Sequence, residues 1–302
     1  MIYLDSFRFP DADWEWATRV GVRGGMTREE REMALRTCYN TMYPFGVLSG
    51  AGLERLDFAT VTILYGGNGS GKSTALNVIA AKLALSRDTC GNSSAFFDQY
   101  AAACHAEEAE PIPAKSRLIT SDDVFDYMLN VRTMNAEIDR TRETLFQAHT
   151  QARQSVFQMK SLADYDELKK RNSARRKTQS SFVREQLGGN VRELSNGESA
   201  LFYFKQRLEE DALYLLDEPE NSLSAARQVE LADFLTESAR YAGCQLVIAT
   251  HSPFLLALPG AKIYDLDTHP VQVKKWTELE NVQVYARFFR EHAGELEEHA
   301  GF

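Results

Sequence analysis

One glycine-rich segment, Gly66-Gly67-Asn68-Gly69-Ser70-Gly71-Lys72-Ser73, constrains the fold of this 302-residue chain more than any other. It matches the pattern G-x-x-x-x-G-K-[ST] at every defined position. The apolar residues 61–65 before it predict a buried strand, and the Ala- and Leu-rich residues 74–85 after it predict a helix. Strand, glycine loop and helix form a unit that holds phosphate groups, so we expect an α/β fold with a nucleotide-binding loop.

The residue types in this loop each have a physical reason. Glycine lets backbone N–H groups converge on phosphate oxygens without a side chain in the way. Lys72 is expected to reach the β- and γ-phosphates, and the Ser73 hydroxyl is expected to bind Mg²⁺. With Thr74 added, residues 66–74 are the candidate nucleotide-binding segment. The loop alone leaves a kinase, a GTPase and a motor protein open.

Two later apolar strands end in residues suited to nucleotide chemistry. Residues 213–216 lead into Asp217 and Glu218; the first carboxylate can hold Mg²⁺ and the second can accept a proton from an attacking water. Residues 245–249 lead into Thr250 and His251. Because parallel strands present their carboxyl ends at one sheet edge, we expect His251 to lie near the phosphates and to contact the γ-phosphate.

A third segment, Leu194-Ser195-Asn196-Gly197-Glu198, precedes a predicted helix over residues 198–210. Ser195 and Glu198 have the spacing of a capping box, which satisfies backbone N–H groups at a helix start. The same helix N-terminus is also a site that favours anions.

Taken in this order, the segments resemble those of the ABC-type ATPases. Residues 194–198 are similar to their signature sequence, Asp217-Glu218 to the Walker B pair and His251 to the switch histidine, while residues 220–224 fall where the D-loop lies. Asp-Glu-Pro-Glu and Thr-His-Ser-Pro are most similar to the heads of the SMC and RecF-like branch, and the whole chain resembles small stand-alone bacterial ATPases related to those heads.

The resemblance implies a P-loop NTPase of the ABC-ATPase type, with a mixed sheet flanked by helices and a helical insertion. It implies ATP and Mg²⁺ as cofactors and ATP hydrolysis as the activity, with Glu218 as general base. It further implies a head-to-tail homodimer that sandwiches two ATP molecules. In that dimer Ser195 and Gly197 of one subunit would contact the γ-phosphate held by the other.

The sequence departs from the family pattern at two places. Asn196 replaces the first signature glycine, although Asn tolerates a left-handed backbone better than most residues. No clear glutamine marks the Q-loop. Asp122 or Asp123, which follow the apolar pair 118–119, are candidates for its metal-facing polar group, and Gln99 is another.

Changes in composition along the chain predict three regions. Residues 1–129 form the N-terminal part of the ATPase core, residues 130–187 a polar helical insertion, and residues 188–302 the C-terminal part of the core, with a β-rich tail from residue 262. The only strongly basic run, residues 169–177, lies in the insertion.

Composition and charge narrow the function classes. A net charge of −9 argues against general affinity for nucleic acid or membranes but leaves a local basic patch open. No signal peptide or membrane-spanning stretch is apparent, and the four cysteines form no C-x-x-C pair, so we expect a cytoplasmic protein without membrane insertion. Three roles remain: a DNA-associated ATPase in genome maintenance or phage defence, an ATP switch acting on a protein effector, or the nucleotide-binding subunit of a transporter.

Overall fold

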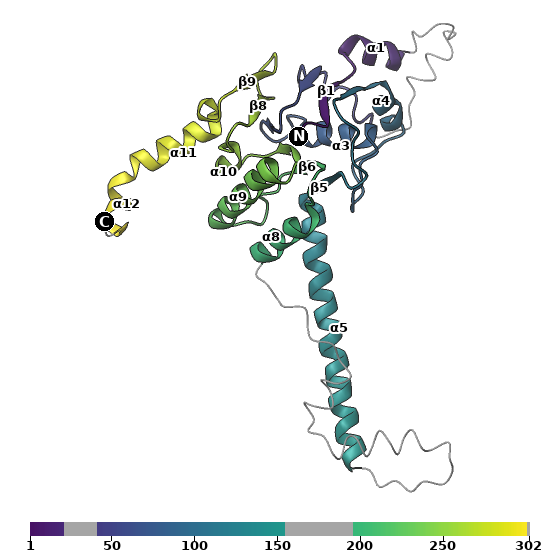
Figure 1. Cartoon of the computed structure of the whole chain (residues 1–302), viewed down its shortest axis with the longest axis vertical. Helices are drawn as coiled ribbons and strands as arrows, with labels where there is room; N and C mark the ends of the chain where they lie inside the picture. The colour runs from purple at the N-terminus through teal and green to yellow at the C-terminus, as the bar shows by residue number, and fades with distance from the viewer. Residues whose placement is uncertain (21–40, 155–195, 301–302) are drawn as a thin grey trace. The chain divides into compact units, whose positions relative to one another are not determined.

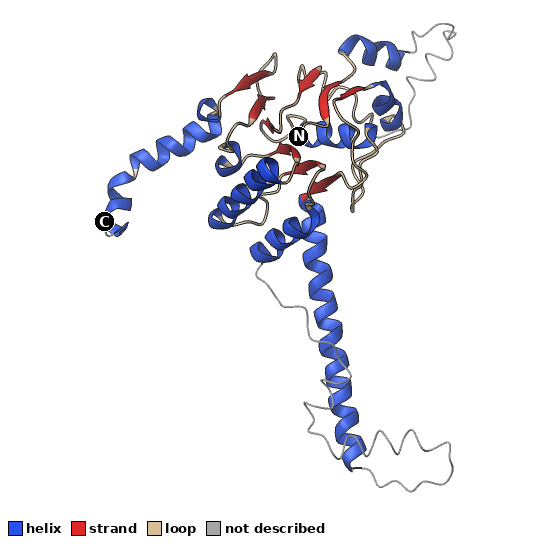
Figure 2. Ribbon diagram, viewed as in Figure 1, coloured by secondary structure: helices blue, strands red, loops and turns tan. Residues whose placement is uncertain are grey.

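The computed structural model describes residues 1–20, 41–154 and 196–300. The chain divides into two compact units, one formed by residues 1–124 with 200–302 and the other by residues 125–199. Figure 1 labels most of the described helices and several strands, and Figure 2 colours helices and strands differently. Within these described ranges, no helix combines the length and the apolar character needed to cross a membrane.

The strands of the first unit form two sheets. They are β1 (Leu4–Arg8), β2 (Arg55–Asp57), β3 (Val61–Tyr65), β4 (His105–Glu108), β5 (Arg117–Thr120), β6 (Leu213–Asp217), β7 (Gln245–Ala249), β8 (Lys262–Asp265) and β9 (Gln272–Lys274). The larger sheet has six strands in the order β5-β6-β7-β3-β8-β9, and the smaller has the order β2-β1-β4. In the larger sheet only β9 is antiparallel to its neighbour, which confirms the α/β class and the mixed sheet expected from the sequence.

The described residues also form helices. They are α1 (Ala12–Val20), α3 (Lys72–Lys82), α4 (Phe97–Ala103), α5 (Ser121–Gln154), α8 (Asn196–Arg207), α9 (Ala225–Tyr241), α10 (Pro253–Leu256), the 3-10 helix η2 (Trp276–Glu278), α11 (Glu280–Glu291) and α12 (Ala293–Ala300). In the second unit the described residues belong to α5, a helix of 34 residues, and to the first turn of α8.

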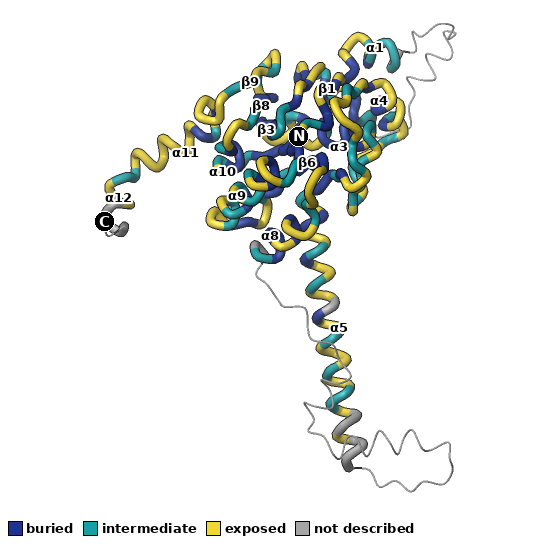
Figure 3. The backbone as a smooth tube through the Cα atoms, in the orientation of Figure 1, coloured by how far each residue is buried: buried dark blue, intermediate teal, exposed yellow. Residues whose placement is uncertain are grey.

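The central strands are buried because they carry almost only apolar residues. β3 and β7 are buried along their whole length, and β6 is buried except at its last residue (Figure 3). One buried polar side chain, Gln245, joins the two sheets: its Oε1 accepts from the N–H groups of Tyr3 and Leu4, and its Nε2 donates to the Leu4 carbonyl. Every polar atom of this amide therefore has a partner, as burial requires.

Strand register brings the ends of four strands to one level. Thr120 of β5 pairs with Asp217 of β6, which pairs with Ala249 of β7, and Ala249 also pairs with Leu64 of β3. The segments that follow these residues therefore emerge side by side at the carboxyl edge of the sheet, where open α/β sheets bind ligands.

The tail is the part of the fold that the sequence pattern described incorrectly. A β-rich tail was expected from residue 262, but after β8 and β9 the chain forms η2, α11 and α12. Apolar residues of α11 recur at helical spacing: Val284, Tyr285, Phe288 and Phe289. Their high β-propensity suggests strand when spacing is ignored, and all four are substantially exposed in the described structure.

Candidate functional site

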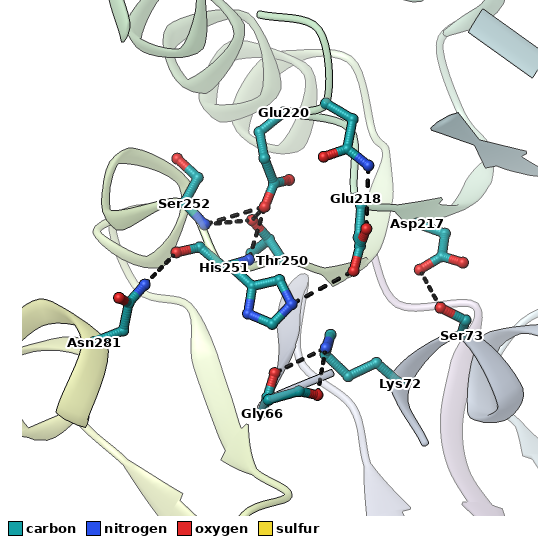
Figure 4. A network of polar contacts seen from close by, with 12 residues as sticks. Gly66, Lys72, Ser73, Asp217, Glu218, Glu220, Thr250, His251, Ser252 and Asn281 are labelled. Atoms are coloured by element: carbon teal, nitrogen blue, oxygen red, sulfur yellow. Dashed lines mark hydrogen bonds and ion pairs between the residues drawn. The ribbon is translucent and has the colours of Figure 1, made fainter. Parts of the chain in front are cut away.

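The lysine of the glycine loop is buried beneath the loop itself. Lys72 is 4% exposed, and its Nζ donates to the carbonyl oxygens of Gly66 at 2.8 Å and Gly67 at 3.1 Å (Figure 4). Burial lowers the pKa of Lys72, and the nearby carboxylates, Glu218 first among them, oppose this shift. An ammonium removed from water in this way gains strongly from an anion placed at the loop.

Two glycines in the loop are there for steric reasons. A Cβ on Gly66 would lie 2.6 Å from Ser70 Oγ, closer than real Cβ contacts. Gly71 caps α3 in the left-handed conformation, with φ of 95°, and this helix start has no side-chain cap. The first N–H groups of α3 are thus not satisfied by a capping side chain, and the helix dipole makes them a site for a phosphate. Asn68, Gly69 and Thr74 lie in the same loop and first turn.

Ser73 and Asp217 meet at the foot of the loop. Ser73 Oγ donates to Asp217 Oδ1 at 3.0 Å (Figure 4). No group of three or more His, Cys, Asp or Glu side chains placed to hold a metal is found among the described residues. Two adjacent oxygen donors fit Mg²⁺, a hard cation that commonly keeps waters and takes further ligands from nucleotide phosphates.

Asp217 gives a prediction about stability and pH. Burial raises its pKa from 3.8 to about 6, against the hydrogen bond from Ser73, which lowers it. A carboxyl whose folded pKa lies above its unfolded value stabilises the fold most at low pH and loses this contribution as the pH rises through about 6. Asp217→Asn keeps an oxygen to accept from Ser73 and carries no charge.

We therefore expect Asp217→Asn to melt at a higher temperature than the wild-type protein at about pH 8, with a difference that shrinks towards about pH 4. Calorimetry of both nucleotide-free proteins across this range measures it. A difference independent of pH would contradict the assigned origin of the shift.

Glu218 is held toward His251 by its backbone and its neighbours. It has φ of 48°, uncommon for a residue with a side chain, and its N–H donates to the Ala249 carbonyl at 2.8 Å. Its Oε1 lies 3.4 Å from His251 Nε2, and its Oε2 accepts from Asn221 Nδ2 at 3.1 Å (Figure 4). Asp217 and Glu218, although adjacent in sequence, thus point to different partners.

The candidates for the Q-loop position differ from one another in the structure. Asp123 is buried and accepts from the N–H groups of Thr89 and Thr120, while its own N–H donates to Thr120 Oγ1. Thr120 and Asp123 therefore form the cap that starts α5, which leaves Asp123 committed to structure. Asp122 lines a polar cavity of about 130 Å³ together with Ser73 and Asp217, whereas Gln99 is exposed on α4 and does not line it.

The candidate signature residues lie at the limit of the described structure. Gly197 is in the first turn of α8, and Ser195 falls outside the described residues, as does the basic run 169–177. Five candidates from different segments are brought together at one edge of the sheet: Lys72, Ser73, Asp217, Glu218 and His251 (Figure 4).

Sequence reasoning missed residues that hold this site from elsewhere in the chain. Gly67 N donates to the carboxylate of Asp267, with both oxygens at 2.8 Å, and Asn281 Nδ2 donates to the His251 carbonyl at 2.9 Å. Both come from segments after β8 that carry no motif. Glu220 and Asn221 belong to residues 220–224, which the sequence placed at the D-loop position, but no role was predicted for either side chain.

Comparison with known proteins gives one family match and several similar structures. Residues 169–257 match the family model described as "AAA domain, putative AbiEii toxin, Type IV TA system". No curated protein matches the chain.

Solved structures with a similar arrangement include an Smc head domain from Pyrococcus furiosus with an extended coiled coil, bound to the C-terminal domain of ScpA (14% identity, 77% of this chain and 95% of that chain, TM-score 0.38). A further example is a dimeric ATP-binding cassette bound to ADP and Pi (13% identity, 74% of this chain and 90% of that chain, TM-score 0.36). Another is an SMC head domain from Thermotoga maritima (15% identity, 70% of this chain and 88% of that chain, TM-score 0.33).

The parallel core of the sheet and the glycine loop have the α/β fold of ABC-like P-loop ATPases, and residues 169–257 match the family model. Nucleotide binding follows from this class of domain.

Proposed function

We propose that the protein hydrolyses ATP with Mg²⁺ and does so as an ATP-dependent homodimer. One observation supports this most strongly: side chains from three separate strand ends converge at one edge of the sheet. They are the hydrogen-bonded pair Ser73 and Asp217, Lys72, and the pair Glu218 and His251. A phosphate loop alone needs no carboxylate–imidazole pair. Hydrolysis needs a positioned base and a positioned donor beside the phosphates.

In the proposed reaction each side chain has a separate task. Lys72 and the N–H groups at the start of α3 bind the phosphates, and Ser73 and Asp217 would hold Mg²⁺, which when bound neutralises charge on the phosphate oxygens. Glu218 accepts the proton of the attacking water at one of its carboxylate oxygens. Asn221 orients this carboxylate, and the His251 ring beside it donates to the γ-phosphate as charge develops there.

The dimer completes the site in this proposal. Ser195 and Gly197 of one chain would bind the γ-phosphate held by Lys72 of the other. The proposal rests on the signature-like residues 194–198, on the ABC-type domain and on the dimeric cassette among the similar structures.

The direct test is phosphate release from ATP by the purified wild-type protein. We expect release that depends on Mg²⁺ and stops when EDTA removes it, with a rate per chain that rises with protein concentration as dimers form. Release that is unchanged by EDTA, or no release at any concentration, would contradict the proposal.

For the biological role we propose defence against infection rather than general genome maintenance. The description of the matching family model, which names a putative toxin of a toxin–antitoxin system, supports this choice. Counting phage plaques on cells that express the wild-type protein or its Glu218→Gln variant tests it. Equal plaque numbers for both and for cells without the protein would argue against a defence role.

A further inference from the structure

The carboxylate of Glu220 holds the loop that carries His251. Its Oε1 accepts from Thr250 Oγ1 at 2.6 Å, from His251 N at 2.7 Å and from Ser252 N at 3.1 Å (Figure 4). Thr250 and Ser252 are buried, so these bonds form away from bulk water. A carboxylate oxygen is among the strongest acceptors a protein offers, and here one such oxygen serves three donors.

The opposite side of the same residue is held by α11. Asn281 Nδ2 donates to the His251 carbonyl at 2.9 Å, and Asn281 N donates to Tyr65 OH at 3.2 Å. Tyr65 is the last residue of β3, directly before the glycine loop. The backbone N–H of His251 is therefore fixed by Glu220 and its carbonyl by Asn281, and with both fixed the ring can point to Glu218.

The second carboxylate oxygen of Glu220 lacks the hydrogen bonds that the first one makes. Glu220 Oε2 is buried and has no hydrogen-bond partner among the described residues. Burying an unpaired polar atom costs free energy. This cost is understandable if Oε1 is needed to gather the three donors of residues 250–252 at one point.

We propose that Glu220 is a positioning residue that directs His251 toward Glu218 through its bonds to residues 250–252, with Asn281 fixing the carbonyl of His251. The inference rests on the proposed ATPase function for its catalytic consequence. The orientation of the His251 ring, which is the geometric part of the inference, is independent of that function.

The test compares Glu220→Ala with Glu220→Gln. Gln retains an oxygen that can accept the same three bonds, whereas Ala retains none. We expect Glu220→Ala to lower kcat by about 100-fold, the size of effect that a small misplacement of a reacting group produces, with KM for ATP unchanged. Glu220→Gln should recover most of this loss. Glu237→Ala, an exposed glutamate of α9, is the matched control and should keep wild-type kcat.

A double-variant experiment separates positioning from a general structural effect. If Glu220 acts through His251, adding Glu220→Ala to His251→Ala should lower kcat no further. A loss of the same size in both backgrounds would overturn the proposal. So would a Glu220→Gln variant as slow as Glu220→Ala while both melt at the wild-type temperature.

A measurement without nucleotide distinguishes failure of this inference from failure of the proposed function. The imidazole resonances of ¹⁵N-histidine-labelled protein are compared, with His251 assigned by its loss in His251→Ala. The His251 signal should shift in Glu220→Ala, stay near its wild-type position in Glu220→Gln and be unchanged in Glu237→Ala. An unshifted signal in folded Glu220→Ala overturns the inference.

If the wild-type protein releases no phosphate, the proposed function fails and this signal alone decides the role of Glu220. If Glu220→Ala does not fold, Asn281→Ala replaces it. Because that variant removes only the bond to the His251 carbonyl, it should shift the same signal by less, and no shift would count against the proposal.

Discussion

Glu218→Gln is expected to lower the rate of ATP hydrolysis by about 1,000-fold, within the range that loss of a general base produces. Gln has nearly the shape of Glu and can still accept from Asn221 Nδ2 through its amide oxygen. It cannot take a proton from water. Binding of ATP should therefore survive while its cleavage stops.

The same variant should accumulate as an ATP-bound dimer, because hydrolysis no longer separates the subunits. Light scattering with ATP and Mg²⁺ should show a doubled mass for Glu218→Gln and a smaller dimer fraction for the wild-type protein. Glu237→Gln provides the control, since this exposed residue on α9 makes the same chemical change away from the site. A Glu218→Gln protein that hydrolyses ATP at the wild-type rate would remove Glu218 from its role.

Lys72→Met should weaken ATP binding by about 100-fold, equivalent to about 2.7 kcal/mol. Met keeps most of the length of the buried side chain but has no charge to offer a phosphate. The nucleotide-free protein should not lose stability to the same degree, because burial already disfavours the charged form of Lys72, as its lowered pKa indicates.

Titration of a fluorescent ATP analogue measures this affinity. Lys82→Met is the matched control: Lys82 lies in the last turn of the same helix, and its Nζ donates to the Ala102 carbonyl. Unchanged affinity in Lys72→Met, or an equal loss in Lys82→Met, would contradict the assignment of the loop.

The sequence predicted those parts of the fold that are encoded locally. The strand before residue 66, the helix after it and the strands ending at Asp217 and Ala249 are all present, because runs of apolar residues bounded by glycine or charge specify them without help from elsewhere. Parallel strands then place their ends together, so the meeting of Ser73 with Asp217 follows from topology.

What the sequence did not reveal depends on contacts between distant segments. Asn281 is 30 positions from His251, and Asp267 is 200 positions from Gly67. No spacing rule connects such pairs. Asp122 and Asp123 show the same limit at short range, because both follow β5 but only Asp123 caps the helix. Its carboxylate accepts from the backbone N–H groups of Thr89 and Thr120, which the sequence does not reveal.

The central claim is that one chain holds only part of the active site. Mixing two variants, each lacking one part of the proposed shared site, tests it most directly. Lys72→Met lacks the lysine of the loop and Ser195→Ala lacks the signature serine, so a mixed dimer contains one doubly damaged site and one intact site. Equal amounts should release phosphate at about a quarter of the wild-type rate, since half of randomly assorted dimers are mixed and each has one working site. A mixture no faster than the average of the two variants measured separately would contradict the shared site.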